Sequence, residues 1–267
     1  TKVEKFTVQV NDGHGGVVNQ DVVLTVVGTT NIPVISNSSG AVTEDVNIQL
    51  PEPGYLDTNG NLNDPSNLLK TPAEFQDLNE AGKYGEFVVK SDGTWTYSAR
   101  NDQDAIQQLA EGETLSDTIY VPAANGKDQG RIEVTITGTN DIPRLASVDT
   151  SGAITEQSVP TNALLSDHGQ INFTDIDLTD RHTVSALAVG SNLGQLEATI
   201  NPDGGGIGSG GVVNWNYSVA DNKLEYLAAG ETRVENFTVQ IDDGNGGTAS
   251  KTIAITITGT EDNPVIS

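Results

Sequence analysis

Residues 237–259 read FTVQIDDGNGGTASKTIAITITG, and this stretch decides the fold. Apolar side chains occupy alternate positions on either side of the segment Asp243-Gly-Asn-Gly-Gly247. Such alternation is typical of strands that bury one face. The Asp-Gly-x-Gly-Gly segment supplies residues that tolerate positive φ in a tight turn. The sequence therefore predicts an antiparallel hairpin of two long strands.

The same pattern occurs twice more in the chain. Residues 6–28 read FTVQVNDGHGGVVNQDVVLTVVG and align with residues 237–259 without a gap. Residues 119–138, IYVPAANGKDQGRIEVTITG, form a shorter copy that has lost the Asp-Gly-x-Gly-Gly turn. Pro122 in this copy predicts a strand that ends early or lies at a sheet edge, because proline cannot donate to the ladder.

Each copy ends at a related seam: Gly28-Thr-Thr-Asn-Ile-Pro33, Gly138-Thr-Asn-Asp-Ile-Pro143 and Gly259-Thr-Glu-Asp-Asn-Pro264. More than a hundred residues separate successive seams, which is the size of a whole domain rather than of a solenoid repeat. We therefore predict the C-terminal hairpin of a preceding repeat over 1–30, full repeats over 31–141 and 142–263, and the start of a linker over 264–267.

The predicted fold class is all-β, with tandem antiparallel Ig-like or cadherin-like β-sandwich domains. Only the segment from Asp102 to Leu109 has a helical pattern, and it is expected to form a single turn over one end of a core. Trp95 and Tyr97 lie two apart on one strand, as do Trp215 and Tyr217. These aromatic pairs could form a ligand-stacking platform, but a place in the core is the favoured interpretation.

The composition is strongly acidic, with 13 Lys and Arg against 37 Asp and Glu and a net charge of −24. Nucleic acid is an improbable partner for such a chain, because phosphate binding needs basic patches. Disulfides and thiolate metal sites are excluded because there is no cysteine. The sequence contains no apolar stretch that could span a bilayer and no Met, so we expect no membrane insertion and a fragment of a longer protein.

Several motifs resemble the VCBS repeats of large RTX-type bacterial adhesins, within the cadherin-like and bacterial Ig-like group. In the first full repeat these motifs are Asp92-Gly-Thr-Trp-Thr-Tyr97, Leu109-Ala-Glu-Gly-Glu-Thr114 and the seam at Gly138. In the second full repeat they are Phe173-Thr-Asp-Ile-Asp177, Leu227-Ala-Ala-Gly-Glu-Thr232 and Asp242-Asp-Gly-Asn-Gly-Gly247. The resemblance covers nearly the whole chain. It implies an antiparallel sandwich, type I secretion, an extracellular location on the surface of a Gram-negative bacterium, and a role in adhesion or biofilm formation.

Clustered carboxylates recur near the seams, and calcium prefers six to eight such hard oxygen ligands. Cadherin-like modules bring together a seam, an early acidic residue and an Asp-x-Asp step, so the resemblance implies one junction site from Asn140, Asp141, Glu156, Asp175 and Asp177. A second site near the first seam would use Glu44, Asp57 and Asn59. Asp262 is the matching aspartate of the last seam, whereas the seam at Thr30-Asn31 lacks it and is expected to bind calcium weakly or not at all.

A turn role is an equally open interpretation for any one of these residues, because Asp and Asn are common at strand ends. The leading functional hypothesis is a structural spacer of a surface adhesin, stiffened by calcium at the repeat junctions. Its expected partners are calcium, neighbouring repeats and, through other regions, a host or biofilm ligand. The alternative is a module that itself binds a glycan or a surface protein. An enzyme is least favoured, since no nucleophile motif accompanies His14, His168 or His182.

Overall fold

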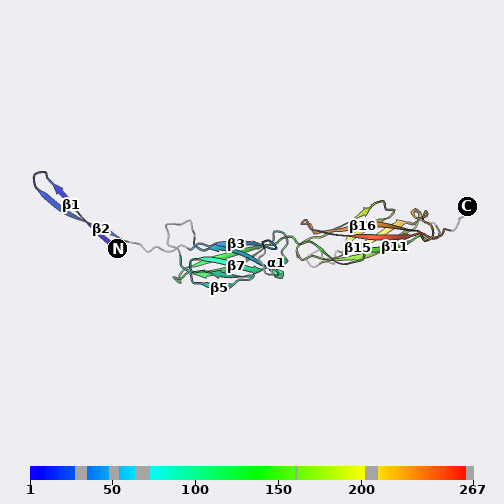
Figure 1. The fold of residues 1–267 in the computed structure, drawn as a ribbon, viewed down its shortest axis with the longest axis horizontal. Helices are drawn as coiled ribbons and strands as arrows, with labels where there is room; N and C mark the ends of the chain where they lie inside the picture. Colours follow the sequence, from blue (N-terminus) through cyan, green and yellow to red (C-terminus); the bar gives the residue numbers. More distant parts are fainter. Residues whose placement is uncertain (28–34, 48–53, 64–72, 160–161, 202–209, 263–267) are drawn as a thin grey trace.

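The computed structural model describes residues 1–27, 35–47, 54–63, 73–159, 162–201 and 210–262, and β-strands dominate these ranges (Figure 1). A two-stranded hairpin lies at the N-terminal end of the long axis, and two sandwiches follow it, spanning residues 38–137 and 144–258 (Figure 1). The predicted all-β fold with antiparallel sandwiches is confirmed.

The N-terminal hairpin pairs β1 (Lys2–Asn11) with β2 (Val17–Val26) in antiparallel register. Asp12 shapes the turn between them, because its Oδ1 accepts hydrogen bonds from the backbone N–H groups of His14 and Gly16, both at 2.8 Å. The β16–β17 turn has the same construction, in which Asp243 Oδ1 accepts from Asn245 at 2.8 Å and Gly247 at 2.9 Å. The repeated turn sequence therefore specifies a repeated turn geometry.

The first sandwich packs a three-stranded sheet against a four-stranded sheet. A single helical turn, α1 (Asp104–Gln107), buries Ile106 at one end of the core, as expected from the sequence. The three-stranded sheet has the order β3 (Ser38–Thr43), β9 (Gln129–Thr137), β8 (Thr114–Pro122), and the other has the order β4 (Tyr55–Asn61), β7 (Thr94–Arg100), β6 (Gly85–Val89), β5 (Leu78–Ala81). Strand β8 ends at Pro122 and lies at the sheet edge, so both predictions from that proline hold.

The second sandwich packs two four-stranded sheets. A short 3-10 helix, Asp221–Lys223, precedes its Leu227 motif as α1 precedes Leu109 in the first repeat. One sheet has the order β10 (Arg144–Val148), β12 (Leu164–Thr174), β15 (Gly211–Ala220), β14 (Gln195–Ile200), and the other has the order β11 (Ser151–Thr155), β17 (Thr248–Thr258), β16 (Thr232–Asp242), β13 (Thr183–Val189). The glycine run at 204–211, expected to be a flexible strand connection, falls mostly outside the described residues.

Each sandwich contains one parallel strand pair among its antiparallel neighbours. Strand β3 runs parallel to β9, with Thr43 beside Thr137, and β11 runs parallel to β17, with Thr155 beside Thr258. The first strand of a repeat therefore ends beside the end of its last strand. This pairing determines where the acidic residues that follow β3 and β11 are placed.

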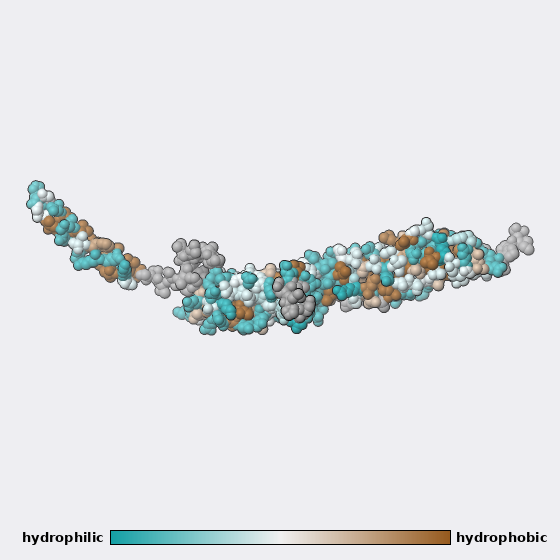
Figure 2. All heavy atoms as spheres, in the orientation of Figure 1, coloured by the Kyte–Doolittle hydropathy of each residue, from teal (hydrophilic) through white to brown (hydrophobic). Residues whose placement is uncertain are grey.

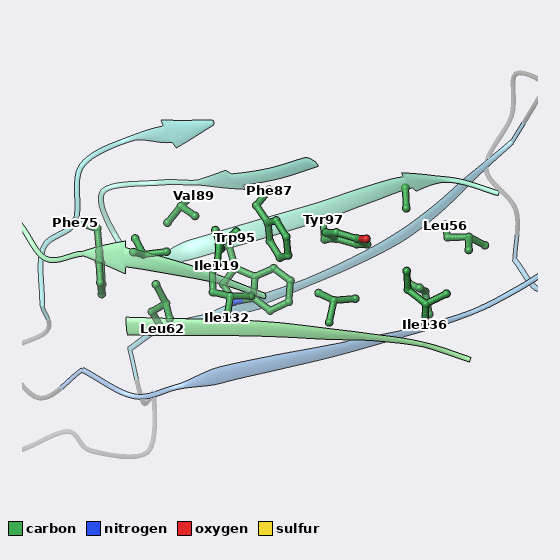
Figure 3. Packing of buried hydrophobic residues seen from close by; sticks show 14 of the residues in the cluster. Leu56, Leu62, Phe75, Phe87, Val89, Trp95, Tyr97, Ile119, Ile132 and Ile136 are labelled. Carbon is green, nitrogen blue, oxygen red and sulfur yellow. The ribbon is translucent and has the colours of Figure 1, made fainter. Parts of the chain in front are cut away.

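The tryptophan–tyrosine pairs lie in the two cores, and Figure 3 shows Trp95 and Tyr97 in the first of them. Trp95 and Trp215 are each 1% exposed. The indole N–H of Trp95 donates to Ser38 Oγ at 2.9 Å, and that of Trp215 donates to the Asp149 carbonyl at 3.0 Å. The core interpretation of these aromatic residues is confirmed, and no exposed tryptophan platform exists.

Two buried carboxylates, Asp117 and Glu235, stabilise equivalent loops of the two sandwiches. Asp117 accepts hydrogen bonds from the backbone N–H groups of Lys83, Tyr84 and Gly85, at 2.7 to 3.1 Å, and from the Tyr97 hydroxyl at 3.0 Å.

Glu235 has the same role in the second repeat. It accepts from the backbone of Leu193 and Gly194 and from the Tyr217 hydroxyl at 2.9 Å. Both carboxylates are almost fully buried, and each ties a loop to the core through several hydrogen bonds at once.

The hairpin β1–β2 exposes the kind of side chain that the sandwiches bury. Figure 2 shows apolar residues along this hairpin. Phe6, Val8 and Val10 are 52%, 49% and 65% exposed, whereas their counterparts Phe237, Val239 and Ile241 are 2%, 1% and 1% exposed. Within the described part of the chain, no second sheet packs on the hairpin.

Candidate metal centre at the repeat junction

The junction between the sandwiches contains a carboxylate from the first repeat, Glu44, which directly follows β3. The Glu44 backbone N–H donates to the Thr137 carbonyl at 2.9 Å, continuing the parallel pairing with β9. The Thr139 backbone N–H donates to Glu44 Oε2 at 3.3 Å. Glu44 therefore lies against its own repeat's C-terminal seam, which also includes Asp141.

The second repeat presents carboxylates to the same seam from the loop after β12 and from the β16–β17 turn. The Asp141 backbone N–H donates to Asp177 Oδ2 at 2.8 Å, and the Asn140 side-chain amide donates to Asp243 Oδ2 at 3.1 Å. These bonds fix the linker between the repeats directly against the acidic residues of the second repeat.

Asp175, Asp180 and Asp243 form a compact group, because one ligand oxygen of each lies within 4.8 Å of the others. All three are buried. Around them, His182 Nε2 contacts Asp175 Oδ2 at 2.9 Å, and the Asn245 amide donates to Asp180 Oδ1 at 2.6 Å. The group is thus built on a rigid framework of hydrogen bonds.

Four buried oxygens at this junction have no hydrogen-bond partner among the described residues: Asn140 Oδ1, Asp141 Oδ2, Asp177 Oδ1 and Asp180 Oδ2. A buried acceptor without a partner costs about 1–3 kcal/mol, and more if it is charged. Several such oxygens from both repeats, close together, have the chemistry of a calcium ligand set. The residues present therefore fit a bound calcium ion.

The protonation equilibria of these carboxylates reflect the same crowding. Burial raises the pKa of Glu44 to about 8, with a further contribution from the neighbouring charges of Asp45, Asp141 and Asp177. Burial also raises the pKa of Asp177 to about 7, aided by Asp180. The pKa values of Asp141 and Asp180 are raised too, again mainly by burial. Burial therefore makes these four side chains easier to protonate than solvated carboxylates, whereas a calcium ion would favour their ionised forms.

A second cluster with the same construction lies at the far end of the second repeat. Ligand oxygens of Glu156, Glu225 and Asp262 lie within 4.8 Å of one another. The Thr260 backbone N–H donates to Glu156 Oε2 at 2.8 Å, as Thr139 donates to Glu44. Glu156 Oε1, Glu225 Oε1 and Thr260 Oγ1 are buried without a partner. This cluster repeats the part of the junction that Glu44 and Asp141 form.

The structure corrects the expected grouping of Glu156 and Glu44. Glu156 does not join Asp141, Asp175 and Asp177, but lies with Asp262 at the next seam. Glu44, which was expected near the first seam with Asp57 and Asn59, lies instead beside Asp141, where Glu156 was expected. The reason is the parallel pairing of the first strand with the last, which brings the early acidic residue to the C-terminal end of its own repeat.

Asp57 and Asn59 are also placed differently from the expectation. Both are exposed in the middle of β4, opposite Ser98 and Thr96 of β7. The strand register shows that they are not the counterparts of Asp175 and Asp177 in the second repeat, and neither lies with Glu44 in a ligand cluster of the described residues.

The tryptophans mark the equivalent positions of the two registers. Gly60 lies opposite Trp95, and Gly169 lies opposite Trp215. A Cβ at either glycine would come within 2.6 Å of the facing indole, so Gly60 and Gly169 are the equivalent positions. The seam at Thr30-Asn31 lies outside the described residues.

Three acidic residues of these clusters were missing from the expected ligand sets: Asp180, Asp243 and Glu225. The sequence pattern predicts only a turn role for Asp243, yet its Oδ1 shapes the turn while its Oδ2 accepts from Asn140 at the seam. Asp180 closely follows the Asp-x-Asp step, and that proximity was a usable signal. Glu225 gave no sequence signal, because its counterpart in the first repeat is Gln107, whose amide donates to Glu44 Oε1 at 2.7 Å.

Comparison with known proteins gives a relative and several distant structural likenesses, while no protein-family model matches the chain. The calcium-binding lectin RapA2 of Rhizobium johnstonii is 29% identical over 192 residues, which cover 67% of this chain and 74% of that protein. A protocadherin gammaB7 cis-dimer structure is 16% identical with a TM-score of 0.47, and covers 86% of this chain and 48% of its own. An endo-fucoidan hydrolase from glycoside hydrolase family 107 is 16% identical with a TM-score of 0.27. The match covers 97% of this chain and 34% of the hydrolase chain.

The chain spans between a third and a half of the length of these two solved structures. Likenesses at this level of identity concern the fold and carry no information about activity. None of the described helices is both long and apolar enough to cross a bilayer.

Proposed function

We propose that the chain is a pair of extracellular adhesion-type repeats whose junction binds calcium. The observation that carries this proposal is the set of buried, unpartnered oxygens at one seam, contributed by the linker residues Asn140 and Asp141 and by Asp177 and Asp180 of the second repeat. Such oxygens would supply ligands from both repeats to the same ions. Calcium would then hold the two sandwiches in one relative orientation.

The proposed ligand set is Glu44, Asn140, Asp141, Asp175, Asp177, Asp180 and Asp243. Asp177 connects the two sides of the cluster, since its Oδ2 accepts from the Asp141 backbone N–H at 2.8 Å and its own backbone N–H donates to Asp175 Oδ1 at 3.2 Å. At the next seam, Glu156, Glu225 and Asp262 would provide the corresponding partial set. The sequence similarity to a calcium-binding lectin supports calcium as the metal.

The biological role that we propose is that of a spacer in a secreted bacterial surface adhesin, with calcium stiffening the array. Attachment, biofilm formation and type I secretion rest on the resemblance to VCBS repeats of RTX-type adhesins. We propose no enzymatic activity, because the clustered carboxylates are buried at a seam between repeats. The buried tryptophans remove the feature that would have favoured an aromatic ligand platform.

Calorimetric titration of calcium into the EDTA-treated full chain tests the metal site. We expect saturable binding that weakens at least tenfold in Asp177→Asn, equivalent to about 1.4 kcal/mol. The matched control is Asp57→Asn on the exposed face of β4, which should bind calcium as the parent does. Absence of binding to the parent chain, or an equal loss in both variants, would contradict the proposal.

A further inference from the structure

A groove on the outer face of the four-stranded sheet of the first repeat has the side chains of a saccharide site. The groove has a volume of about 590 Å³ and is lined chiefly by Tyr55, Tyr84, Glu86, Ser98, Arg100 and Gln103. Tyr55 and Arg100 are cross-strand partners on β4 and β7, and Ser98 faces Glu86 of β6. One tyrosine and three polar side chains therefore line the outer face of one sheet next to each other.

The polar groups of the groove are held in place by internal bonds. The Arg100 guanidinium makes a two-point contact with the Asp102 carboxylate, through Nε at 3.0 Å and Nη2 at 2.7 Å. The Gln103 amide nitrogen donates to the carbonyls of Tyr84 and Arg100, both at 2.8 Å. Fixed, planar hydrogen-bonding groups reduce the entropy cost of binding a ligand rich in hydroxyls.

An exposed aromatic ring completes the chemistry. Tyr55 is 36% exposed, and Lys83 Nζ lies 4.8 Å from the centre of the Tyr84 ring on the neighbouring loop. A tyrosine presents a flat apolar face with a polar hydroxyl at its tip, which suits the C–H face and the hydroxyl rim of a pyranose. The acidic members of the lining, Glu86, Asp102 and Asp104, outnumber Arg100, so an anionic ligand is disfavoured.

The second repeat shows that the sandwich itself does not require this groove. Its strand register places Leu164 opposite Ala220, where the first repeat has Tyr55 opposite Arg100. The buried Trp–Tyr pair is the same in both repeats, and the Ser98–Glu86 pair is matched by Ser218–Gln195, so the framework is shared while Tyr55 and Arg100 are replaced. Tyr55 and Arg100 are therefore features of the first repeat that the shared sandwich does not require.

We propose that this groove binds an uncharged saccharide, independently of calcium at the junction. The ligand stacks on Tyr55, and its hydroxyls pair with Arg100, Glu86 and Gln103. The site does not rest on the proposed metal centre, because none of its lining residues belongs to the proposed ligand set.

Amide chemical shifts of the isotope-labelled full chain test the proposal, with cellotriose, maltotriose and mannotriose as the probes. We expect at least one trisaccharide to shift the amides of Glu86 and Ser98 at millimolar concentration, equally in calcium and in EDTA. Tyr55→Ala and Arg100→Ala should each weaken that binding at least tenfold. The matched control, Leu164→Ala at the equivalent position of the second repeat, should leave it unchanged.

Three outcomes overturn the proposal. They are the absence of any shift with all three probes, shifts centred on the second repeat or the seam, and shifts that disappear in EDTA. Shifts that disappear in EDTA would mean that the saccharide binds at the calcium junction and not in the groove. If the chain bound no calcium but the amides of the groove still shifted, only the proposed metal centre would be rejected. Unchanged amide chemical shifts of the core residues would show that the Tyr55→Ala variant is folded.

Discussion

At the residue scale, burial and nearby negative charge both raise the pKa of Glu44. Its pKa is about 8 in the folded, calcium-free protein, against an ordinary value of 4.5. Ionisation is therefore easier in the unfolded chain than in the folded one. The stability that this difference contributes is present below about pH 4.5 and is lost as the pH rises through about 8.

We predict that calcium-free protein loses stability between pH 5 and 8, by at most about 1.4 kcal/mol per pH unit for one proton. Urea unfolding in EDTA across this range measures the effect, and Glu44→Gln should flatten the profile. Saturating calcium should reverse the trend, because metal binding requires ionised carboxylates. A Glu44→Gln profile as steep as that of the parent would contradict the assignment.

Asp117 is the second residue whose environment gives a direct prediction. Asp117→Ala leaves three backbone N–H groups and the Tyr97 hydroxyl without their acceptor. We expect a loss of about 2–3 kcal/mol in the free energy of unfolding of the first repeat, since buried unpaired donors are costly. Denaturant unfolding followed by Trp95 fluorescence in a Trp215→Phe background isolates this repeat.

The control for that experiment is Asp102→Ala, which removes a partner of the exposed Arg100 contact. Exposed ion pairs contribute less than about 1 kcal/mol. Equal losses in both variants would mean that the buried carboxylate is no more important than a surface one.

At the element scale, the strand pairs β4–β7 and β12–β15 each place a glycine beneath a tryptophan. A Cβ at Gly60 would lie 2.6 Å from the Trp95 ring, and a Cβ at Gly169 would lie 2.4 Å from the Trp215 ring. Overpacking of a filled core costs about 1–3 kcal/mol. Each alanine variant should therefore destabilise its own repeat, as thermal unfolding with a near-ultraviolet signal would show.

Thr96→Ala provides the control on the same sheet, because Thr96 is exposed on β7. Its effect should stay within about 0.5 kcal/mol. If Gly60→Ala were equally mild, the tryptophan would have room to move and the register argument for Gly60 and Gly169 would weaken.

At the scale of the whole molecule, the repeats touch through contacts that need no metal as well as through the acidic seam. The Leu178 backbone N–H donates to the Gln108 carbonyl at 3.4 Å, and the Thr179 hydroxyl donates to Glu113 Oε1 at 3.0 Å. These two bonds are few and peripheral. Alone they should not hold the repeats at a fixed angle against the repulsion of the buried carboxylates.

We therefore predict that EDTA loosens the junction without unfolding either core. Small-angle scattering should show a changed maximum dimension and greater flexibility, while far-ultraviolet circular dichroism stays constant. Asp177→Asn in calcium should shift the scattering in the same direction as EDTA. An unchanged maximum dimension on calcium removal would exclude a stiffening role.

The sequence by itself determined the strands, the hairpin turns and the repeat spacing of this protein. Alternation around Asp243-Gly-Asn-Gly-Gly247 is a local signal, and the turn carboxylate forms its bonds within four residues. The core position of Trp95 and Trp215 was likewise predictable, because equivalent aromatic pairs recur at one place on a half-buried strand. Local periodicity was enough for each of these features.

Only the tertiary structure decided which carboxylates meet. The parallel pairing of β3 with β9, and of β11 with β17, depends on contacts between residues nearly a whole repeat apart, so no local pattern reveals it. That pairing sends Glu44 to the seam of Asp141 and Glu156 to the seam of Asp262. Long-range register therefore determines the composition of the proposed metal centre, although every one of its residues is visible in the sequence.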